Sequence, residues 1–308
     1  MHATPHASRA HADHAATSLA RCVPCARAHS FIVLPGAHSC YFARFFWSAE
    51  LELLATHQTY SHAGRTYVAP FKRVHVDGEG TLRFVWWRAN ERLKGAEMPV
   101  QPDAQVDVQA DAEPASKAPA SSFVGTVNVS VGAVFEATVT SPAQPLPRAS
   151  PPLLSLPGFL FELQTSGSPR GMASGMPLGD ETAAKAGALI AVVDAAARVT
   201  LAFLNASTPP FAPPVLIETW DRQLRGMSAA EPMRLRVLYR RDMLEMYVND
   251  VLLPVYLMPP STGRVGLVPE AAGLVSGLRR WAMDLPGDGY PFREEKVADH
   301  ASIEIRIL

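Results

Sequence analysis

Short runs of alternating apolar and polar residues, separated by turn sequences, recur along this chain. The pattern is clearest in MRLRVLYRRDMLEMYVNDVLLPVYLMPPSTGRVGLV, residues 233–268, with breaks at Arg-Arg-Asp, Asn-Asp and Ser-Thr-Gly. A period of two is typical of strands, because successive side chains of a strand point to opposite faces of the sheet. The stretch therefore predicts consecutive antiparallel strands joined by tight turns.

Strand patterns of the same kind fill the chain from residue 123 onward. The only helical candidate there, Asp180 to Ala188, is short and lies within a Gly-rich stretch. Roughly ten or eleven short strands without a long amphipathic helix predict an all-β sandwich or barrel. The further strand sequences are TVNVSV (126–131), AVFEATV (133–139), GFLFEL (158–163), ALIAVV (188–193), RVTLAFL (198–204), PVLIETW (214–220) and GLVSGLRRWAMDL (273–285).

Alternation also assigns the faces of two of these strands. Around residue 235, Leu235 and Val237 share one face and Arg234 and Arg236 share the other. On the next strand, the face opposite the apolar one carries Met243, Glu245 and Tyr247. We expect one side of the sheet to be core.

Changes in composition divide the chain into four parts. Residues 1–48 are rich in Ala, His, Arg and Ser, with Asp13 as their only acid, and are predicted to be a low-complexity, disordered segment. Residues 49–96 contain a small β-hairpin segment. Residues 97–121 have the composition of a linker, and residues 122–308 form the predicted sandwich.

The hairpin is predicted from TYVAPFKRVHVDGEGTLRFVWW, residues 66–87, in which two strand patterns flank Asp-Gly-Glu-Gly. Its second arm places Phe84 and Trp86 on one face and Trp87 on the other. Because both faces carry large apolar groups, we expect the hairpin to be covered on both sides. The hairpin thus gives three candidates for contacts between domains: Phe84, Trp86 and Trp87. Glu245, in the middle of its strand, is interpreted either as an outward polar residue or as a fourth such contact.

Charge and length exclude several partners. A net charge of -1 offers no basic surface for nucleic acid. No run of about 18 apolar residues is present, so we expect no membrane-spanning helix. The three cysteines lie near the start with scattered histidines, and no second paired element at zinc-site spacing follows them. We therefore predict neither metal nor cofactor, and the sequence indicates no compartment.

Aromatic residues are the candidates for contact with sugars, because sugars stack their apolar faces on Trp and Tyr rings. Packing in the core or at an interface is the alternative for each of them, since Tyr and Trp are favoured in strands. Both interpretations stay open for Trp220, Tyr239, Tyr247, Tyr256 and Trp281.

Residues 235–268 resemble the C-terminal β-sandwich of glycoside hydrolase family 32, the β-fructosidases that include invertases, levanases and inulinases. The similarity lies in LEMYVND, residues 244–250, and in the Gly-Arg-Val-Gly-Leu strand start at residues 263–267. Residues 67–95 are similar to the family segment that connects the catalytic propeller to the sandwich. The resemblance implies a concanavalin-like antiparallel sandwich. Val251 departs from the Gly that often follows Asn-Asp in the family.

The resemblance also implies three catalytic motifs on a five-bladed propeller: Trp-Met-Asn-Asp-Pro-Asn-Gly, Arg-Asp-Pro and Glu-Cys. None of them occurs in this sequence. Retaining hydrolysis needs two carboxyl groups about 5 Å apart, one nucleophilic and one able to donate a proton. Arg241-Asp242 and Asn249-Asp250 are interpreted as turn formers at strand ends. No catalytic residue is predicted.

Two functional hypotheses follow. In the first, the chain is the non-catalytic sandwich portion of a truncated or degenerate family member, inactive alone, with a missing or separate propeller as its partner. Phe84, Trp86 and Trp87 would then expose an apolar patch. In the second, it is a stand-alone, lectin-like carbohydrate-binding module. Convergence of acids at an unrecognised active site is a third possibility, for Asp180, Glu181, Glu218 and Asp221.

Overall fold

The computed structural model describes ten segments of the chain, all within the compact unit from Val33 to Leu308. They are residues 40–48, 50–60, 66–77, 82–100, 122–140, 153–164, 186–205, 214–220, 231–240 and 243–284. In this described part the elements are strands and three short 3₁₀ helices, η1 (Arg88–Leu93), η2 (Leu153–Ser155) and η3 (Pro269–Leu274). None of its helices is long and apolar enough to cross a membrane.

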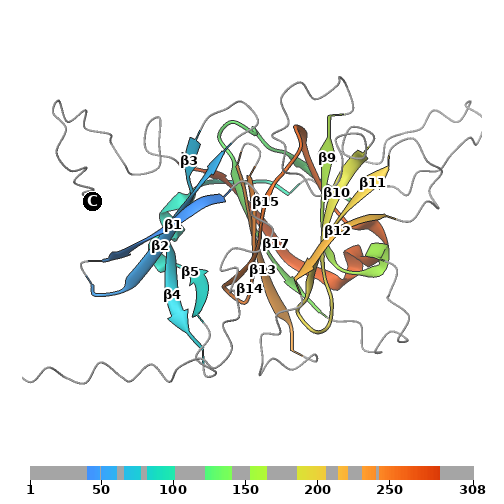
Figure 1. The fold of residues 1–308 in the computed structure, drawn as a ribbon. Helices are drawn as coiled ribbons and strands as arrows, with labels where there is room; N and C mark the ends of the chain where they lie inside the picture. The colour runs from blue at the N-terminus through green and yellow to red at the C-terminus, as the bar shows by residue number, and fades with distance from the viewer. Residues whose placement is uncertain are drawn as a thin grey trace, which may run out of the picture. The chain divides into compact units, whose positions relative to one another are not determined.

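The larger sheet has eleven strands in the order β1-β2-β4-β5-β15-β14-β13-β8-β17-β6, with β3 paired to β2. All its pairs are antiparallel, and Figure 1 labels most of its strands. The strands are β1 (Cys40–Trp47), β2 (Leu53–Tyr60), β3 (Thr66–Val68), β4 (Lys72–Val76), β5 (Leu82–Trp86), β6 (Lys94–Met98), β8 (Ala133–Val139), β13 (Met233–Arg240), β14 (Met243–Val248), β15 (Val251–Leu257) and β17 (Val275–Met283).

The smaller sheet has six strands in the order β12-β11-β10-β9-β16-β7. They are β7 (Ser122–Thr126), β9 (Gly158–Leu163), β10 (Ala186–Val193), β11 (Val199–Asn205), β12 (Val215–Trp220) and β16 (Ser261–Leu267). The outer face of this sheet is covered at Ile190 and Val192, which form a small cluster with residues beside η2 and η3. Two antiparallel sheets confirm the all-β class that the alternation predicted, and they form the sandwich, not the barrel that the alternation also allowed.

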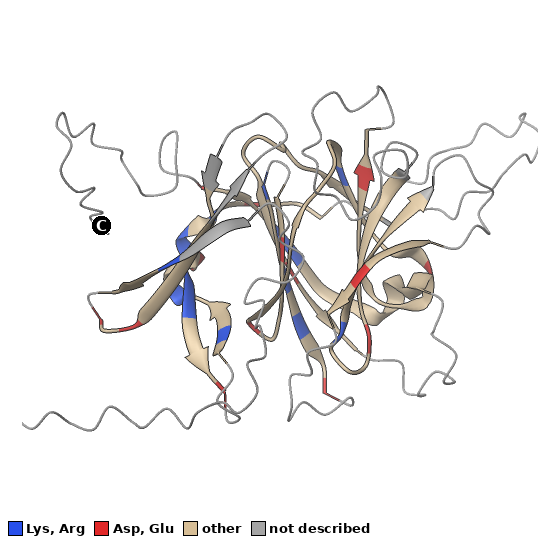
Figure 2. Cartoon of the chain, in the orientation of Figure 1, with Lys and Arg blue, Asp and Glu red and all other residues tan. Residues whose placement is uncertain are grey.

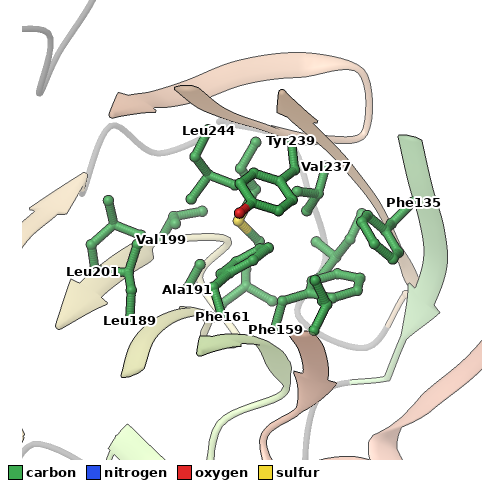
Figure 3. Packing of buried hydrophobic residues seen from close by; sticks show 14 of the residues in the cluster. Phe135, Phe159, Phe161, Leu189, Ala191, Val199, Leu201, Val237, Tyr239 and Leu244 are labelled. Atoms are coloured by element: carbon green, nitrogen blue, oxygen red, sulfur yellow. The ribbon is translucent and has the colours of Figure 1, made fainter. Parts of the chain in front are cut away.

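The main core lies between the two sheets and contains side chains from both (Figure 3). The rings of Phe135 and Phe159 are 5.6 Å apart, and those of Phe161 and Tyr239 are 5.3 Å apart. Leu235 and Val237 point into this core, as the sequence predicted. The sandwich is therefore stabilised by apolar burial between the inner faces.

The opposite face of the larger sheet is covered as well. Strands β2, β4 and β5 lie against β13 and β14 and form a second apolar cluster that includes Leu54, Phe71, Leu238 and Tyr247. Arg236 and Glu245, which alternation placed away from the core, are 3% and 0% exposed. We call this second buried layer the seam. Its presence explains why β13 and β14 are buried on both faces.

The predicted hairpin is confirmed by the pairing of β4 with β5 in continuous register from Lys72 with Trp86 to Val76 with Leu82. A long-range pairing of Val85 with Val251 joins this hairpin to the sandwich sheet. The Trp86 amide reinforces that junction by donating to the carbonyl of Asp250 over 2.7 Å. The hairpin segment is thus part of the larger sheet.

The turn between β14 and β15 uses Asn249 and Asp250, which have φ values of 46° and 67°. Positive φ at both central residues is characteristic of the type I′ turn that suits a two-residue hairpin. Asn and Asp tolerate this conformation, so Val251 can begin the next strand without a glycine in the turn. Asn249-Asp250 is a turn former, as predicted, and Arg241-Asp242 lies outside the described residues.

Three local predictions differ from the structure. Residues 126–131 were expected to be a strand, but β7 ends at Thr126 and the Asn128 carbonyl closes a turn by accepting from the amides of Val131 and Gly132. Strand β1 lies within the range expected to be disordered, whose first 39 residues are outside the description. Of the helical candidate, residues 186–188 begin strand β10, and the rest lies outside the described part.

Candidate functional site

A buried ion pair joins strand β4 to strand β14 across the seam. The Lys72 ammonium lies 2.5 Å from Oε1 of Glu245, and both side chains are 0% exposed. The Tyr247 hydroxyl donates to Oε2 of the same carboxylate over 2.7 Å. The ammonium also donates to the carbonyl of Pro70. Because both carboxylate oxygens are engaged and the side chain is 0% exposed, Glu245 is arranged to hold two layers together.

Both members of the ion pair come from strands that have a neighbour on each side. Lys72 of β4 pairs with Ala55 of β2 and with Trp86 of β5, so it lies in the middle of that layer. On β14, Glu245 pairs with Leu238 and Val255 in the middle of the larger sheet. Apolar neighbours on each side keep water away from the ion pair, which strengthens the attraction between the charges.

His57 is the third ionisable group of this cluster. Its Nε2 lies 3.7 Å from Oε1 of Glu245, and its side chain is 0% exposed. Burial, together with the positive charge of Lys72, holds the pKa of His57 well below its usual value. Neither ring nitrogen has a hydrogen-bond partner within the described segments. The imidazole is therefore neutral at pH 7 and sits beside the ion pair as a buried, uncharged ring.

A second cluster of charged side chains, after that of Lys72, Glu245 and His57, centres on Arg236 at the side of the seam near η1. Its guanidinium is 2.6 Å from Oε1 of Glu136 and 2.6 Å from Oδ1 of Asp250, and it reaches Oε1 of Glu91 at 3.2 Å. The same group lies 4.1 Å from the centre of the Trp86 ring. Three carboxylates and an aromatic face thus converge on one buried cation, which fixes β13 against β8, η1 and the β14–β15 turn.

Glu91 and Glu136 of this second cluster share two cations, Lys94 and Arg236, so they are the pair to compare with a hydrolytic pair. Lys94 Nζ lies between them, 2.6 Å from Oε2 of Glu91 and 2.7 Å from Oε1 of Glu136. Burial raises the pKa of Glu136, but hydrogen bonds and positive charge from Lys94 and Arg236 outweigh it and hold that pKa below its ordinary value. A general acid needs the opposite shift, and a sugar would need the space that Lys94 fills.

The other carboxylates that form ion pairs follow the same pattern. In the described ranges, Glu97 pairs with Arg279, Glu162 with Arg264, Asp194 with Arg198, Asp77 with Arg83 and Glu52 with Arg73. A hydrogen bond from Arg279 is the main cause that lowers the pKa of Glu97. The hypothesis of an unrecognised active site involved four acids. Of these, Glu218 is on strand β12 of the smaller sheet, opposite Leu201 of β11, and the other three lie outside the described residues.

The five aromatic residues considered for sugar stacking are all buried. Trp220, Tyr239 and Tyr256 belong to the core between the sheets, and Tyr247 and Trp281 belong to the seam. Their exposed fractions range from 0% for Tyr239 to 7% for Trp281. Burial also raises the pKa of the Tyr256 hydroxyl. None of these rings presents an open face to solvent, because all five lie in the two apolar layers. Contact of these residues with a sugar stays a prediction.

The four candidates for contacts between domains lie in or beside the seam. Phe84 and Trp86 are 3% and 7% exposed, and the Trp86 ring packs edge-on against Tyr247 at 5.2 Å. Trp87 is half-buried and donates to Oε2 of Glu52 over 2.8 Å. The expected apolar patch is therefore absent at Phe84 and Trp86. Contact of these residues and of Glu245 with another domain stays a prediction.

Sequence reasoning missed Lys72, His57 and Arg236 as members of buried clusters. One signal was available in the sequence: the face of β13 and β14 opposite the core carries both charged and large apolar residues. Among the described residues no group of three His, Cys, Asp or Glu side chains could hold a metal ion. Of the cysteines and histidines considered for zinc, Cys40 begins β1 and the others lie outside the described part.

No protein-family model and no curated protein matches this chain. Solved structures that match it include sucrose-6-phosphate hydrolase from Lactobacillus gasseri, at 12% identity and a TM-score of 0.45. They also include a glycoside hydrolase family 32 protein from Bifidobacterium adolescentis, at 10% and 0.47, and fructan 1-exohydrolase IIa from Cichorium intybus, at 12% and 0.40. The matches cover 80%, 82% and 81% of this chain but only 41%, 32% and 49% of those chains.

Proposed function

We propose that this chain is a non-catalytic β-sandwich portion of a protein of the glycoside hydrolase family 32 type, without hydrolytic activity of its own. The sequence resemblance of residues 235–268 to the family sandwich supports the first half of the proposal. The absence of the three propeller motifs from this sequence supports the second half. In this account the chain contributes a rigid sandwich, and the chemistry of β-fructoside hydrolysis belongs to a propeller domain.

The observation that carries the proposal is the pairing of the carboxylates with cations. Glu136 and Glu91 are bridged by Lys94 and share Arg236. A retaining pair needs one carboxylate free to attack and one carboxylic acid free to donate. Ion pairing keeps both groups occupied, and it lowers the pKa of Glu136, so these acids stabilise the fold instead of reacting with a substrate.

The proposed partner is a separate propeller domain, and β-fructosides reach the assembly through that domain. Every aromatic considered for direct sugar contact is buried, so no observation favours a stand-alone lectin-like module over this account. To bind the isolated sandwich, a fructan would have to contact groups other than those five rings. Glycan binding is accordingly assigned to the assembly and not to the isolated chain.

The direct test is fructose release from sucrose, inulin and levan by the purified full-length chain, beside an active β-fructosidase at equal molarity. The proposal predicts release no faster than in buffer. Glu136→Gln serves as the matched variant, because it removes the less exposed carboxylate of the Lys94 bridge, 18% against 46% for Glu91. Release that scales with the concentration of the chain and disappears in Glu136→Gln would overturn the proposal and make the second cluster an active site.

A further inference from the structure

The turn between β7 and β8 contains Asn-Val-Ser at residues 128–130, the acceptor pattern for N-linked glycans. The chain contains such a pattern twice, and the second is Asn-Ala-Ser at residues 205–207. The structure distinguishes the two asparagines. Asn128 is exposed and follows the end of β7, whereas Asn205 is the last residue of β11 and pairs with Ala186 of β10. The first acceptor is thus on a turn, and the second is in a strand ladder.

Backbone hydrogen bonds and packing hold this turn in place. The Asn128 carbonyl accepts from the amides of Val131 and Gly132 over 3.1 and 2.8 Å. Asn128 and Ser130 are both exposed, and Val129 between them packs against the main core. The fold therefore presents the two functional side chains of the acceptor pattern to solvent and uses the middle side chain as an anchor.

The two ends of the Asn128 side-chain amide have different surroundings. Its Oδ1 accepts from the Ser130 hydroxyl over 2.6 Å and from the Ser130 amide over 3.1 Å. Two donors directed at this atom identify it as the oxygen of the amide. Nδ2, the atom that receives an N-linked glycan, has no hydrogen-bond partner among the described residues. Attachment of a glycan to Nδ2 therefore breaks no hydrogen bond of the described fold.

The same two donors help the amide to react. Loss of a proton from Nδ2 places negative charge on Oδ1, because the two atoms share the electrons of the amide. Donors that already point at the atom where charge develops stabilise the reactive form. The Ser130 hydroxyl and amide occupy these positions in the folded chain. The turn is thus arranged for attack by Nδ2.

The surroundings of the turn are compatible with an anionic glycan donor. Residues 123–135 include no Lys, Arg, Asp or Glu, so this stretch is coloured tan in Figure 2. An acid beside the acceptor would repel a pyrophosphate group, and this stretch has none. Val131, in the same turn, is 37% exposed, so a glycan on Asn128 would lie beside an apolar side chain that is open to water.

We infer that Asn128 is an N-glycosylation site whose substrate is an oligosaccharide carried on a lipid pyrophosphate. The reaction forms a bond between Nδ2 and the anomeric carbon of the first sugar, and it breaks the bond from that carbon to the pyrophosphate oxygen. The lipid pyrophosphate and one amide proton leave. Ser130 is the positioning residue for this reaction. The inference is independent of the proposed lack of hydrolytic activity, because it involves a surface turn and neither cluster of charged side chains.

The test is the intact mass of the full-length chain after passage through the endoplasmic reticulum of a eukaryotic host, directed there by a leader that is then removed. We expect the mass of one N-linked oligosaccharide, released by a peptide N-glycosidase and mapped to Asn128. Asn128→Gln and Ser130→Ala should each lose it. Ser130→Thr should keep it, because the hydroxyl remains. Circular dichroism should be the same for all these variants, since both positions are exposed.

Ser276→Ala is the matched control. Ser276 is an exposed serine on β17 whose hydroxyl donates to the carbonyl of Thr138 over 3.4 Å, so the variant removes a comparable hydroxyl away from the acceptor pattern. It should be glycosylated like the wild type. A wild-type chain that has lost its leader and carries no glycan, or carries one only on Asn205, would overturn the inference. A glycan that persists on Asn128 in Ser130→Ala would overturn the role of Ser130.

Discussion

Removal of one partner from the buried ion pair should destabilise the protein severely. In Lys72→Met the Glu245 carboxylate loses its only described ammonium partner and keeps one hydrogen bond, from Tyr247, at 0% exposure. Breaking a buried pair in this way typically costs about 3–5 kcal/mol of unfolding free energy. For a sandwich of this size we expect Tm to fall by roughly 10 °C or more.

The double variant Lys72→Met/Glu245→Met separates the charge effect from packing. It removes both charges and leaves the Tyr247 hydroxyl without its acceptor, a loss of about 1–3 kcal/mol. The double variant should therefore be more stable than Lys72→Met, by roughly 2 kcal/mol on the same estimates. Urea unfolding followed by circular dichroism measures the difference, provided that the transition is two-state.

Arg264→Met is the surface control for this experiment. Arg264 and Glu162 form an ion pair in which the two side chains are 52% and 37% exposed. Breaking an exposed pair of this kind costs about 0–1 kcal/mol. If Lys72→Met were no more destabilising than Arg264→Met, the ammonium would have access to water, and the description of the seam as a dry layer would be refuted.

Further predictions concern pH and close packing. Because the pKa of His57 is depressed on folding, the folded state binds fewer protons, and unfolding free energy should fall as pH drops below 6.5; His57→Leu should flatten that part of the profile. The depressed pKa of Glu136 adds a second loss below pH 4.5, which Glu136→Gln should remove from urea titrations. Gly158→Ala would place Cβ 2.1 Å from the carbonyl oxygen of Ala191 and should cost about 1–3 kcal/mol or prevent folding, whereas Gly273→Ala meets nothing within 4 Å and should leave Tm nearly unchanged.

Local pattern predicted the sandwich strands well because one face of each is apolar. The segment GFLFEL became β9 at residues 158–163 as predicted, and AVFEATV became β8 at residues 133–139. The segment at residues 126–131 was misassigned because Asn128 offers its side chain and carbonyl to the following residues and closes a turn. Alternation alone cannot distinguish such a turn from a short strand.

The seam was not predictable from pattern, because periodicity separates two faces of a strand without indicating what covers the second. Glu245 was assigned to the face away from the core, which is correct, yet that face is fully buried. Its partner Lys72 lies 173 residues away in sequence. The pairing of Val85 with Val251, which brings the hairpin to the sandwich, is equally non-local. The burial of Tyr247 and Trp281 in the seam was unpredictable for the same reason, since they fill a layer that the sequence does not reveal.

The central claim, that this chain does not itself hydrolyse β-fructosides, is tested most directly by trapping. Retaining hydrolysis passes through a covalent glycosyl-enzyme intermediate on a carboxylate. The measurement is the intact mass of the chain after incubation with a fluorinated fructosyl substrate whose intermediate breaks down slowly. The account predicts an unchanged mass. An added fructosyl unit, mapped to any carboxylate of the chain, would contradict it.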